Sequence, residues 1–590
     1  MCGITAVVSM DGQNIPHELM KKMTDAIDHR GPDAEGYYDG QGFSFGHKRL
    51  SIIDLSPKGY QPMLYKGNRI IYNGEVYNFQ EIRAELVDKG YCFESDTDTE
   101  VVLAAYDFWG QECVRRFNGM WAFVIYDVKK NILFASRDRF GIKPFYWSVS
   151  GRYLAMVSEI KQLTFLPDWK AKLNKKRAFD FLSLGYHIHT NETLFEGVFA
   201  LPPGRNMVFD LAKKKYTFQA YYDLSEIKED KDMTFAQAKK QFASILEDAI
   251  RIRMIADVKI GSALSGGLDS SSIVCKMANR SDDVETVSAC FSTEGYDERQ
   301  WMDAVVNKTG VTSHRTFPNL DDFVNELDRM TWYHDEPVVW PALFTQYEVF
   351  RKAKEQEILV MLDGQGADEV LAGYPKFYKP YFKNLLKESP IRAGKELISF
   401  FRLHSIGPKQ AFQKASAFAK KGKETVTWID PDFAQATYLR KPESTIREVS
   451  LNLISEVGLP ALLHYEDRNS MAFSVESRLP FLDYRLVELL IQMPDKFKIK
   501  DAKRKYILRE SLKDILPEEV YRRYDKMSYE TPFGEWMDAN QKFVQDELKD
   551  AISNLKGIVN QEVMGLEDPL VVWRVIAFNR WVKRFGVEYN

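Results

Sequence analysis

The 590-residue chain has few cysteines, no long apolar run and no recognisable targeting segment. An odd number of cysteines with irregular spacing, and without a Cys-x-x-Cys pair, argues against a zinc site and a disulfide framework and favours a reducing cytoplasm. They are Cys2, Cys92, Cys113, Cys275 and Cys290. No stretch approaches the roughly 20 apolar residues of a membrane span. The first residues lack a basic segment followed by a long apolar run, so we expect neither a membrane anchor nor a secretory signal.

The chain also lacks an excess of either charge. It has 80 Lys and Arg against 84 Asp and Glu, which gives a net charge of −4. A nucleic-acid-binding surface would need a basic excess, so we expect no nucleic-acid partner. Hydrophobic residues make up 45% and charged residues 28%, as in ordinary globular proteins. Domains usually hold about 100–200 residues, so two or more domains are expected.

The first part of the chain, residues 2–210, is predicted to form one domain rich in β structure. Apolar runs at 4–9 and 69–72 indicate strands, and the second is expected to end in a turn at Asn73-Gly74. A helix is predicted over 100–109 from the spacing of its apolar residues, and a hairpin over 121–126 and 132–136.

A polar stretch, 224–233, indicates a linker, which we assign to 211–233. Thr234 is a candidate N-cap for an amphipathic helix that follows it. Strands and helices then alternate, which is typical of a parallel sheet in an α/β domain, assigned to 234–545. The chain after Tyr374 is predicted to be a mostly helical extension. A basic stretch at 420–423 is expected to be a solvated face, and no role is assigned to the tail at 546–590. The alternating elements are predicted at 258–264, 271–278, 286–291, 301–309, 345–354 and 358–362.

Cys2 is the first candidate for catalysis. A small residue at position 2 permits removal of Met1, which leaves Cys2 with a free α-amine. An α-amine titrates at about 7.7–8.0, so it can accept the thiol proton near neutral pH. One residue would then supply both nucleophile and base. Taken alone, a cysteine at this position could be there by chance.

Four further motifs follow Cys2 in order: His29-Arg30-Gly31-Pro32-Asp33, Arg49-Leu50-Ser51-Ile52, Asn73-Gly74-Glu75 and Thr97-Asp98-Thr99-Glu100. With them, the first 200 residues resemble the class II, N-terminal-nucleophile, glutamine amidotransferases. The resemblance implies an α+β domain, an αββα sandwich of antiparallel sheets, with Cys2 as the nucleophile. It also implies that the Asn73 side chain and the Gly74 amide stabilise the tetrahedral oxyanion.

The same resemblance implies how glutamine is bound. Arg49 matches the clamp for the α-carboxylate, and Asp98 the partner of the α-ammonium. Asp98 could instead be a helix N-cap, and Glu75 either a substrate contact or a solvated turn residue. The remaining residues of the implied glutamine site are Leu50, Ser51, Ile52 and Ile53.

A glycine-rich loop, Ser265-Gly266-Gly267-Leu268-Asp269-Ser270-Ser271, joins a predicted strand to a predicted helix. Glycines let the backbone approach an anion, and a helix N-terminus favours phosphate. No lysine follows these glycines, so the loop is not a Walker A motif. It resembles the pyrophosphate loop of enzymes that cleave ATP to AMP and pyrophosphate, and ATP is therefore the expected substrate.

A second cluster, Asp363-Gly364-Gln365-Gly366-Ala367-Asp368-Glu369, follows the strand predicted at 358–362. Carboxylates at a strand end suit Mg²⁺, which takes one or two of them together with substrate phosphates. These acids could also merely cap helices. The resemblance implies that Asp269 and Asp368 share the magnesium ion. By the same resemblance, Leu264, Phe291, Asp363 and Gly364 belong to the ATP site.

Asp467-Arg468, the run from Val475 to Asp483, and Lys505-Tyr506-Ile507-Leu508-Arg509 resemble the glutamine-hydrolysing asparagine synthetase family. The resemblance now covers residues 2 to about 540. It implies that Lys505 meets the developing charge of an acyl-adenylate, although Lys503 is close by and a solvated helix lysine is the alternative. The implied reaction converts aspartate, glutamine and ATP to asparagine, glutamate, AMP and diphosphate. A homodimer in the cytoplasm is expected.

Gln365 departs from that family, many of whose members carry Glu there. A glutamine side chain cannot act as a general base. The carboxylate could be dispensable, Asp363 or Asp368 could replace it, or the chain could use another acceptor or synthesise weakly. Two alternatives follow from this: the same architecture amidating a surface uronic acid or a specialised metabolite, and a catalytically weak regulatory or storage protein.

Overall fold

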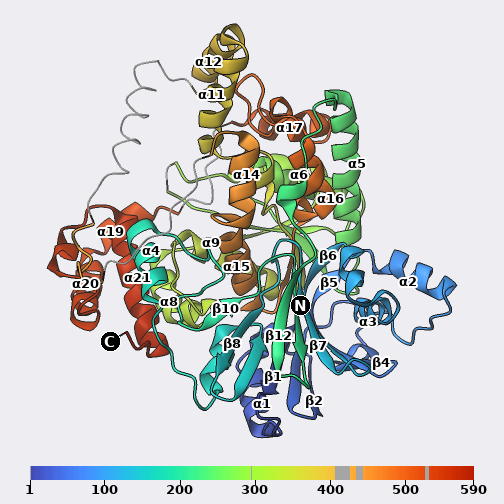
Figure 1. The fold of residues 1–590 in the computed structure, drawn as a ribbon. Helices are drawn as coiled ribbons and strands as arrows, with labels where there is room; N and C mark the ends of the chain where they lie inside the picture. Colours follow the sequence, from blue (N-terminus) through green and yellow to red (C-terminus); the bar gives the residue numbers. More distant parts are fainter. Residues whose placement is uncertain (1, 294, 405–425, 434–442, 525–530, 590) are drawn as a thin grey trace.

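The computed structural model describes residues 2–293, 295–404, 426–433, 443–524 and 531–589 (Figure 1). Met1 and the basic stretch at 420–423 lie outside these residues. Among them, no helix has the length and apolarity needed to cross a membrane.

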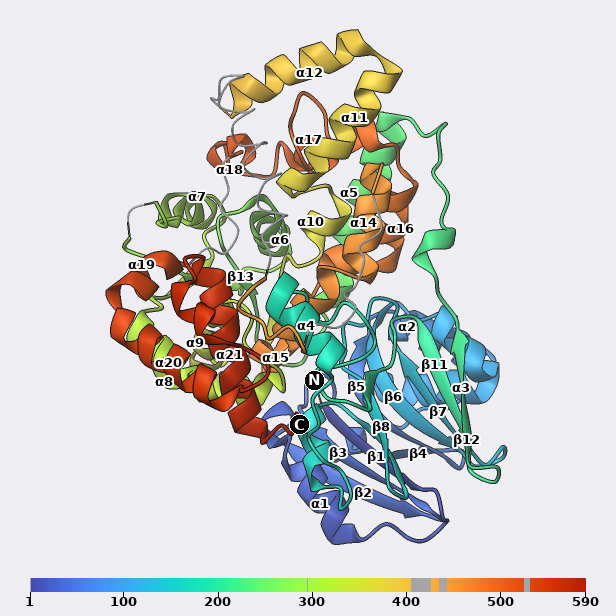
Figure 2. The same cartoon turned by 60° about the vertical axis from the view of Figure 1, so that its left-hand side comes forward.

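In the described residues, the N-terminal part forms two six-stranded antiparallel sheets that pack face to face (Figure 2). The strand orders are β10-β8-β9-β1-β3-β2 and β12-β11-β7-β6-β5-β4. The first sheet consists of β1 (Gly3–Ser9), β2 (Ala34–Gly40), β3 (Phe43–Arg49), β8 (Tyr146–Ser150), β9 (Tyr153–Val157) and β10 (Val198–Ala200). The second consists of β4 (Met63–Tyr65), β5 (Asn68–Val76), β6 (Gly119–Asp127), β7 (Ile132–Arg137), β11 (Arg205–Asp210) and β12 (Lys215–Ala220).

Strand β1 shows why this sandwich forms. Successive side chains of a strand point to opposite faces. Ile4, Ala6 and Val8 face the second sheet, whereas Val7 packs on the outer side, where α1 (His17–Asp25) lies. Helices α2 (Phe79–Asp88) and α3 (Asp98–Trp109) cover the outer face of the second sheet. The αββα sandwich expected from the resemblance is confirmed.

Strand β5 corrects one prediction, because Asn73-Gly74 is not a turn. The strand continues to Val76, and Asn73 and Gly74 pair with Ala122 and Trp121 of β6. A Cβ atom at Gly74 would lie 2.2 Å from the carbonyl oxygen of Met120. Glycine is therefore required here by the close approach of a neighbouring strand, a constraint that sequence alone does not distinguish from a turn.

The predicted linker is also partly wrong. Residues 215–220 form the edge strand β12, which is hydrogen-bonded to β11. Its side chains are mostly exposed, so it lacks the buried apolar run from which the other strands were predicted. The strand is followed by α5 (Phe235–Arg253), which begins where predicted: Thr234 and Gln237 form a capping box.

The second part contains the expected parallel sheet, with order β15-β14-β13-β16-β17. Its strands are β13 (Ile260–Ala263), β14 (Glu285–Ala289), β15 (Thr312–Thr316), β16 (Val360–Leu362) and β17 (Glu476–Arg478). Strands β15 and β17 were not predicted. The helices between the strands are α6 (Leu268–Ala278), α7 (Arg299–Thr309), α8 (Leu320–His334), α9 (Ala342–Glu355) and the short α10 (Ala367–Val370).

The described residues after Tyr374 are mostly helical, as predicted, apart from β17. Helices α11 and α12 extend from one end of the molecule (Figure 1), and α15 lies between the two parts (Figure 2). The helices are α11 (Tyr378–Glu388), α12 (Pro390–Leu403), α14 (Ile446–Ser455), α15 (Leu459–Met471), α16 (Tyr484–Gln492), α17 (Tyr506–Leu512), α18 (Glu518–Arg522) and α19 (Phe533–Ala539).

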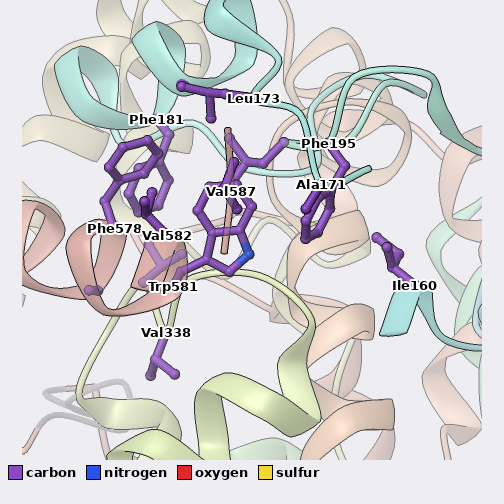
Figure 3. Close-up of a cluster of buried hydrophobic side chains, with 14 of the residues drawn as sticks. Ile160, Ala171, Leu173, Phe181, Phe195, Val338, Phe578, Trp581, Val582 and Val587 are labelled. Atoms are coloured by element: carbon purple, nitrogen blue, oxygen red, sulfur yellow. The ribbon is translucent and has the colours of Figure 1, made fainter. Parts of the chain in front are cut away.

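The tail joins the two parts of the molecule. The boundary expected at 545/546 falls inside α20 (Gln541–Asn554), which packs on α21 (Pro569–Phe585). Helix α21 in turn packs on α4 (Lys175–Leu184) and α8. Figure 3 shows Trp581 of α21 among Phe181, Phe195 and Val338, which come from both parts of the chain.

Candidate active sites

Cys2 lies at the contact between the two parts of the molecule. Its backbone oxygen accepts a hydrogen bond from Nε of Arg30 at 3.1 Å. The Arg30 guanidinium also binds both carboxylate oxygens of Asp467 on α15, at 2.8 and 2.9 Å. Charge-assisted bidentate pairs fix geometry, so α15 helps to hold the Cys2 backbone in place. Burial raises the pKa of the Cys2 thiol, which therefore needs a base to become a nucleophile.

Asn73 is oriented by Cys2 itself. The Cys2 nitrogen donates to Oδ1 of Asn73 at 3.1 Å. The buried Nδ2 of Asn73 has no hydrogen-bond partner within the described residues. An unpaired buried donor is costly, so its presence beside a nucleophile is suited to an oxyanion that forms only during reaction.

A pocket opens beside Cys2 and contains most of the predicted glutamine site. Ser51 and Asn73 are not among the residues that line it; the Ser51 amide donates to Oδ2 of Asp33 at 2.7 Å. The predicted lining residues are Cys2, Arg49, Leu50, Ile52, Ile53, Gly74, Glu75 and Asp98. Sequence reasoning missed Gly59, Gln61, Tyr72, Thr97, Thr99 and Glu476.

Arg49 is buried in this pocket, where backbone carbonyls hold it. Its guanidinium donates to the oxygens of Ser56 at 2.9 Å and Asp54 at 2.5 Å. No carboxylate of the described chain lies within ion-pair distance of Arg49. A buried cation without a counter-ion favours an anionic ligand such as an α-carboxylate.

Asp98 is not the cap of α3, because Thr97 performs that role by accepting from the amide of Glu100. Oδ2 of Asp98 accepts from Tyr72 Oη at 2.7 Å and from the Val76 amide at 2.9 Å. Burial raises the pKa of Asp98 to about 6. The group is therefore ionised at neutral pH and can meet an ammonium group.

Glu476 brings a carboxylate of the parallel sheet into the same pocket. It lies on β17 and accepts from Nε of Arg478 at 2.7 Å. Burial alone would raise the pKa of Glu476, but the positive charges of the amino terminus and of Arg478 lower it to about 2. Burial raises the pKa of Glu75 well above its usual value, although Arg478 lies 3.5 Å away. The signal for Glu476 was its position in the 475–483 motif, to which no role had been given.

The glycine-rich loop leads from β13 into α6, as predicted. Gly266 has φ +66°, and a Cβ atom there would lie 2.8 Å from Cβ of Trp301. Both the left-handed backbone and the lack of space require glycine. Within the loop, the Ser265 amide donates to Oγ of Ser270 at 3.2 Å. The loop is therefore fixed before any ligand binds.

Lys505 joins the two predicted carboxylate positions. Its Nζ lies 2.5 Å from Asp269 and 2.6 Å from Asp368. Lys505 itself has φ +54°, a left-handed conformation that is rare for lysine. Strained backbone of this kind costs about 1–3 kcal/mol and is concentrated at functional sites. Nζ and the two carboxylates therefore form a preorganised centre at the loop.

Two cavities of about 250 Å³ flank this centre, and Asp368 and Tyr374 line both. One contains the predicted residues Ser265, Asp269, Ser270, Asp363, Gly364, Gln365 and Asp368, together with Trp340, Gln346 and Tyr465. The other is rich in cations that were not predicted: besides Lys505, it has Arg504, Arg509 and Arg523. A cationic cavity beside a phosphate loop suits a polyphosphate.

Some predicted ATP-site residues line neither cavity. Leu264 directly follows β13 and packs in the apolar core, and Ser271 is fully buried inside α6, where its hydroxyl has no hydrogen-bond partner among the described residues. The others are Gly266, Gly267 and Phe291. Their predicted contacts with ATP stay predictions.

Magnesium fits this centre by the chemistry of its donors. One ammonium group contacts both Asp269 and Asp368, so the two carboxylates are close enough to face a common cation. Mg²⁺ takes one or two carboxylates and completes its shell with phosphates and water. No cluster of three His, Cys, Asp or Glu residues with metal-binding geometry occurs in the described chain, so substrate phosphates would have to supply further ligands.

Comparison with known proteins gives a separate family match for each of the two parts of the molecule. A family model described as asparagine synthase matches residues 241–567, more than half of the chain. The chain belongs to the asparagine synthetase family. A model of the glutamine amidotransferase domain matches residues 1–222.

Curated relatives of the family match almost the whole chain. The chain is 29% identical to asparagine synthetase [glutamine-hydrolyzing] 1 of Bacillus subtilis, over 91% of this chain and 88% of the relative. It is 31% identical to asparagine synthetase [glutamine-hydrolyzing] 3 of the same species, over 89% and 86%. It is also 26% identical to the amidase chyE of Penicillium rubens, over 100% and 99%. These relatives support membership of the family, but their names give more than one activity.

Proposed function

We propose that this chain makes L-asparagine from L-aspartate, L-glutamine and ATP, with L-glutamate, AMP and diphosphate as the other products. The observation that carries the proposal is the pairing of two sites: a Cys2 pocket with an unpaired Asn73 donor, and a Lys505 centre at a lysine-free phosphate loop. The domain assignment 2–210 for glutaminase and 234–545 for synthetase remains part of this proposal, with a linker shortened by β12.

Glutamine hydrolysis would occur at Cys2 after removal of Met1. The α-amine takes the thiol proton, and Sγ attacks the side-chain carbonyl carbon of glutamine. Nδ2 of Asn73 and the Gly74 amide receive the oxyanion, the carbon–nitrogen bond breaks, and ammonia leaves with the proton held by the amine. Water then hydrolyses the thioester to glutamate. Arg49 and Asp98 hold the α-carboxylate and the α-ammonium.

Aspartate activation would occur at the loop. An oxygen of the aspartate β-carboxylate attacks the α-phosphorus of ATP, and pyrophosphate leaves toward the cavity of Arg504, Arg509 and Arg523. Lys505 neutralises charge on the phosphates. Magnesium held by Asp269 and Asp368 would supply further charge neutralisation when bound. Ammonia then attacks the acyl carbon, AMP leaves, and the nitrogen loses one proton.

Ammonia would cross between the sites within the contact of the two parts. Leu50, Ile52, Met120 and Ile142 of the glutaminase part belong to one buried cluster with Leu479 and Phe481 of the synthetase part. An apolar interior disfavours the charged ammonium form, which keeps the nitrogen nucleophilic. This contact supports direct transfer rather than release into bulk water.

A second candidate is the same chemistry on another carboxylate. The observation that favours it is the fungal amidase, whose match spans this entire chain. The residues around the Lys505 centre activate any carboxylate and do not by themselves select aspartate.

Carboxylate-dependent exchange of labelled pyrophosphate into ATP separates the two candidates, because it reports adenylation alone. We expect exchange with L-aspartate that exceeds exchange with glutamate, a uronic acid or a hydroxy acid by at least about tenfold, the lower end of the discrimination that one methylene group gives. Exchange that is strong with another acid and absent with aspartate would overturn asparagine synthesis in favour of the second candidate. Lack of exchange with every acid would overturn both.

A further inference from the structure

Helix α12 of the helical extension contacts the loop that carries Lys505. Its residue Glu396 is buried, with 9% of its surface exposed. Oε1 of Glu396 accepts from the Asp501 amide at 3.0 Å, and Oε2 accepts from the Ala502 amide at 2.7 Å. One carboxylate thus satisfies two consecutive backbone donors. A glutamine side chain could not do so, because it has only one acceptor oxygen.

These two amides belong to a tight turn whose backbone conformation does not suit its residues. Lys500 and Lys503 each donate a backbone amide to the other's backbone oxygen, at 3.2 and 2.9 Å. Asp501 and Ala502 lie between them with φ of +52° and +58°. Two-residue turns with positive φ at both central positions strongly favour Asn-Gly. Aspartate tolerates this conformation, whereas the Cβ atom of an alanine lies too close to the following carbonyl oxygen.

Ala502 is held in this conformation by both helices of the extension. It is fully buried and packs among apolar residues of α11 and α12. Its backbone oxygen accepts from Oη of Tyr378 on α11 at 2.6 Å, and its amide donates to Glu396 on α12. A strained backbone persists only where its surroundings over-determine it. The conformation of the turn therefore depends on contacts made by the two helices.

The turn also fixes the segment on which Lys505 lies. Three residues after Lys503, the amide of Tyr506 donates to the backbone oxygen of Lys498 at 2.9 Å. Lys505 therefore lies between two backbone anchors, with φ +54°. If the turn opened, the anchor at Lys503 would be lost. Nζ of Lys505 would then no longer be held at 2.5 and 2.6 Å from the two carboxylates of its centre.

We propose that Glu396 is a positioning residue that holds the turn at 500–503 in its left-handed conformation and thereby keeps Lys505 in place for adenylation. The proposal rests on the proposed function, because it concerns the step at which a carboxylate displaces pyrophosphate. Glu396 lines neither cavity of the Lys505 centre, so it acts through the backbone and not by touching a substrate. The helical extension thus has a role in the reaction.

Changing the acid and the turn together tests this proposal. Glu396→Gln leaves one amide without an acceptor and should lower aspartate-dependent pyrophosphate exchange by about 10- to 100-fold. The loss should appear in kcat rather than in KM for aspartate, because Lys505 acts on charge that develops during the reaction. Asp501→Asn/Ala502→Gly makes the turn Asn-Gly, which favours positive φ by itself. Added to Glu396→Gln, this pair should restore exchange to within about threefold of wild type.

Three controls separate this effect from a general loss of stability. Gly394→Ala can stabilise α12 without changing the turn, so adding it to Glu396→Gln should not restore pyrophosphate exchange. Lys395→Met alters the neighbour of Glu396 in the same helix, which lines the same surface cavity, and should leave pyrophosphate exchange unchanged. Glutaminase activity should stay unchanged in every variant, because the turn belongs to the other part of the molecule.

Hydrogen–deuterium exchange reports the turn itself, whatever the substrate. In a peptide that spans 496–508, Glu396→Gln should speed deuterium uptake, and the Asn-Gly turn should slow it again. If Glu396→Gln does not fold, Asp501→Val takes its place. The side chain of Asp501 is exposed, and a β-branched residue adopts positive φ only under strain, so pyrophosphate exchange should fall in the same way.

The two proposals fail differently. Absence of aspartate-dependent pyrophosphate exchange in the wild-type chain contradicts asparagine synthesis, and deuterium uptake then still tests the turn. Unchanged pyrophosphate exchange in Glu396→Gln or in Asp501→Val, where the wild type is active, would overturn the positioning role. So would deuterium uptake that Glu396→Gln does not alter, or recovery that is no better with the Asn-Gly turn than with Gly394→Ala.

Discussion

Single residues in strained or buried positions mark both sites more sharply than their motifs do. Lys505 shows this best, since its left-handed backbone and its two carboxylate contacts at 2.5 and 2.6 Å were invisible in the sequence. Lys503, two residues earlier, was the competing candidate. Its Nζ lies over the Tyr524 ring at 5.7 Å, and it contacts neither carboxylate. The structure therefore separates two lysines that sequence alone left open.

The first prediction uses that pair of lysines. Lys505→Ala should lower aspartate-dependent pyrophosphate exchange by at least about 100-fold, because charge developing on the phosphates loses its preorganised counter-ion. Glutaminase activity should remain. Lys503→Ala is the matched control and should retain exchange. Equal losses in the two variants would show that general positive charge, and not the position of Lys505, supports the reaction.

The second prediction concerns pH at Asp98. Burial raises the pKa of Asp98 to about 6, so the carboxyl becomes neutral as pH falls through that value and can no longer hold an α-ammonium. KM for glutamine should rise by about tenfold for each pH unit below about 6, whereas protonation of the α-amine base, which titrates at about 7.7–8.0, should appear in kcat. Glu476, with a pKa of about 2, stays charged across this range and cannot cause the change. The measurement is the KM for glutamine in the glutaminase reaction at pH values from about 5 to about 8, spaced about one pH unit apart.

Asp98→Asn tests the assignment of that titration. The variant keeps the shape but not the charge, so its KM should be high at every pH and should lack the inflection. An inflection that persists in Asp98→Asn would assign the titration to another group.

At the scale of elements, much of the fold could be predicted, and the failures share a cause. The strand at 4–9 and the N-cap at Thr234 depend on local sequence, and both predictions are confirmed. Strand β17 has three residues inside a helical region, and its pairing with β16 is set by tertiary contacts. That missed strand carries Glu476, which explains why its place in the Cys2 pocket was also missed.

Helix α15 explains why the site was only partly predictable. Its successive residues face different partners: Tyr465 lines the synthetase cavity, Glu466 accepts from the hydroxyl of Ser477, and Asp467 binds Arg30. The motif indicated that this region matters. Which residue serves which site depends on the rotation of the helix between the two parts, and no local pattern specifies that.

The third prediction is at the element scale and concerns the contact of β5 with β6. Gly74→Ala puts a Cβ atom 2.2 Å from the Met120 carbonyl oxygen, so the strands must separate. We expect a loss of about 1–3 kcal/mol in the free energy of unfolding and a larger, selective loss of glutaminase activity, since the Gly74 amide moves. Thermal unfolding and ammonia-dependent synthesis report the two effects separately.

Gly394→Ala is the control for that variant. Gly394 lies inside α12, and an added Cβ meets nothing within 4 Å. Alanine should be neutral or stabilising there by up to about 1 kcal/mol. Equal destabilisation by the two substitutions would contradict the steric explanation.

At the scale of the whole molecule, the C-terminal tail holds the two halves together. Trp581 is buried among side chains of both parts (Figure 3), and its Nε1 donates to the backbone oxygen of Asp335 at 2.9 Å. Trp573 is another buried residue of α21, and its Nε1 donates to the backbone oxygen of Val338 at 2.8 Å. The tail is therefore a structural element of the contact across which nitrogen is proposed to pass.

The fourth prediction follows from that position. Trp581→Ala should destabilise the protein by about 3–5 kcal/mol, as for other large buried aromatic residues. It should also raise the ratio of glutamate to asparagine formed, because a looser contact releases ammonia. Leu570→Ala, at a position 47% exposed on the same helix, is the control and should change neither quantity. An unaltered product ratio in a destabilised Trp581→Ala protein would contradict the link between tail and transfer.

The central claim is that nitrogen freed at Cys2 is received at the Lys505 centre. The most direct measurement supplies glutamine labelled with ¹⁵N in its amide, together with ATP, Mg²⁺, aspartate and excess unlabelled ammonium, and follows the label. We predict labelled asparagine formed in equal amount to AMP, and only unlabelled asparagine from Cys2→Ala. Asparagine that carries the isotope ratio of the bulk ammonium, or label transfer that survives in Cys2→Ala, would contradict the claim.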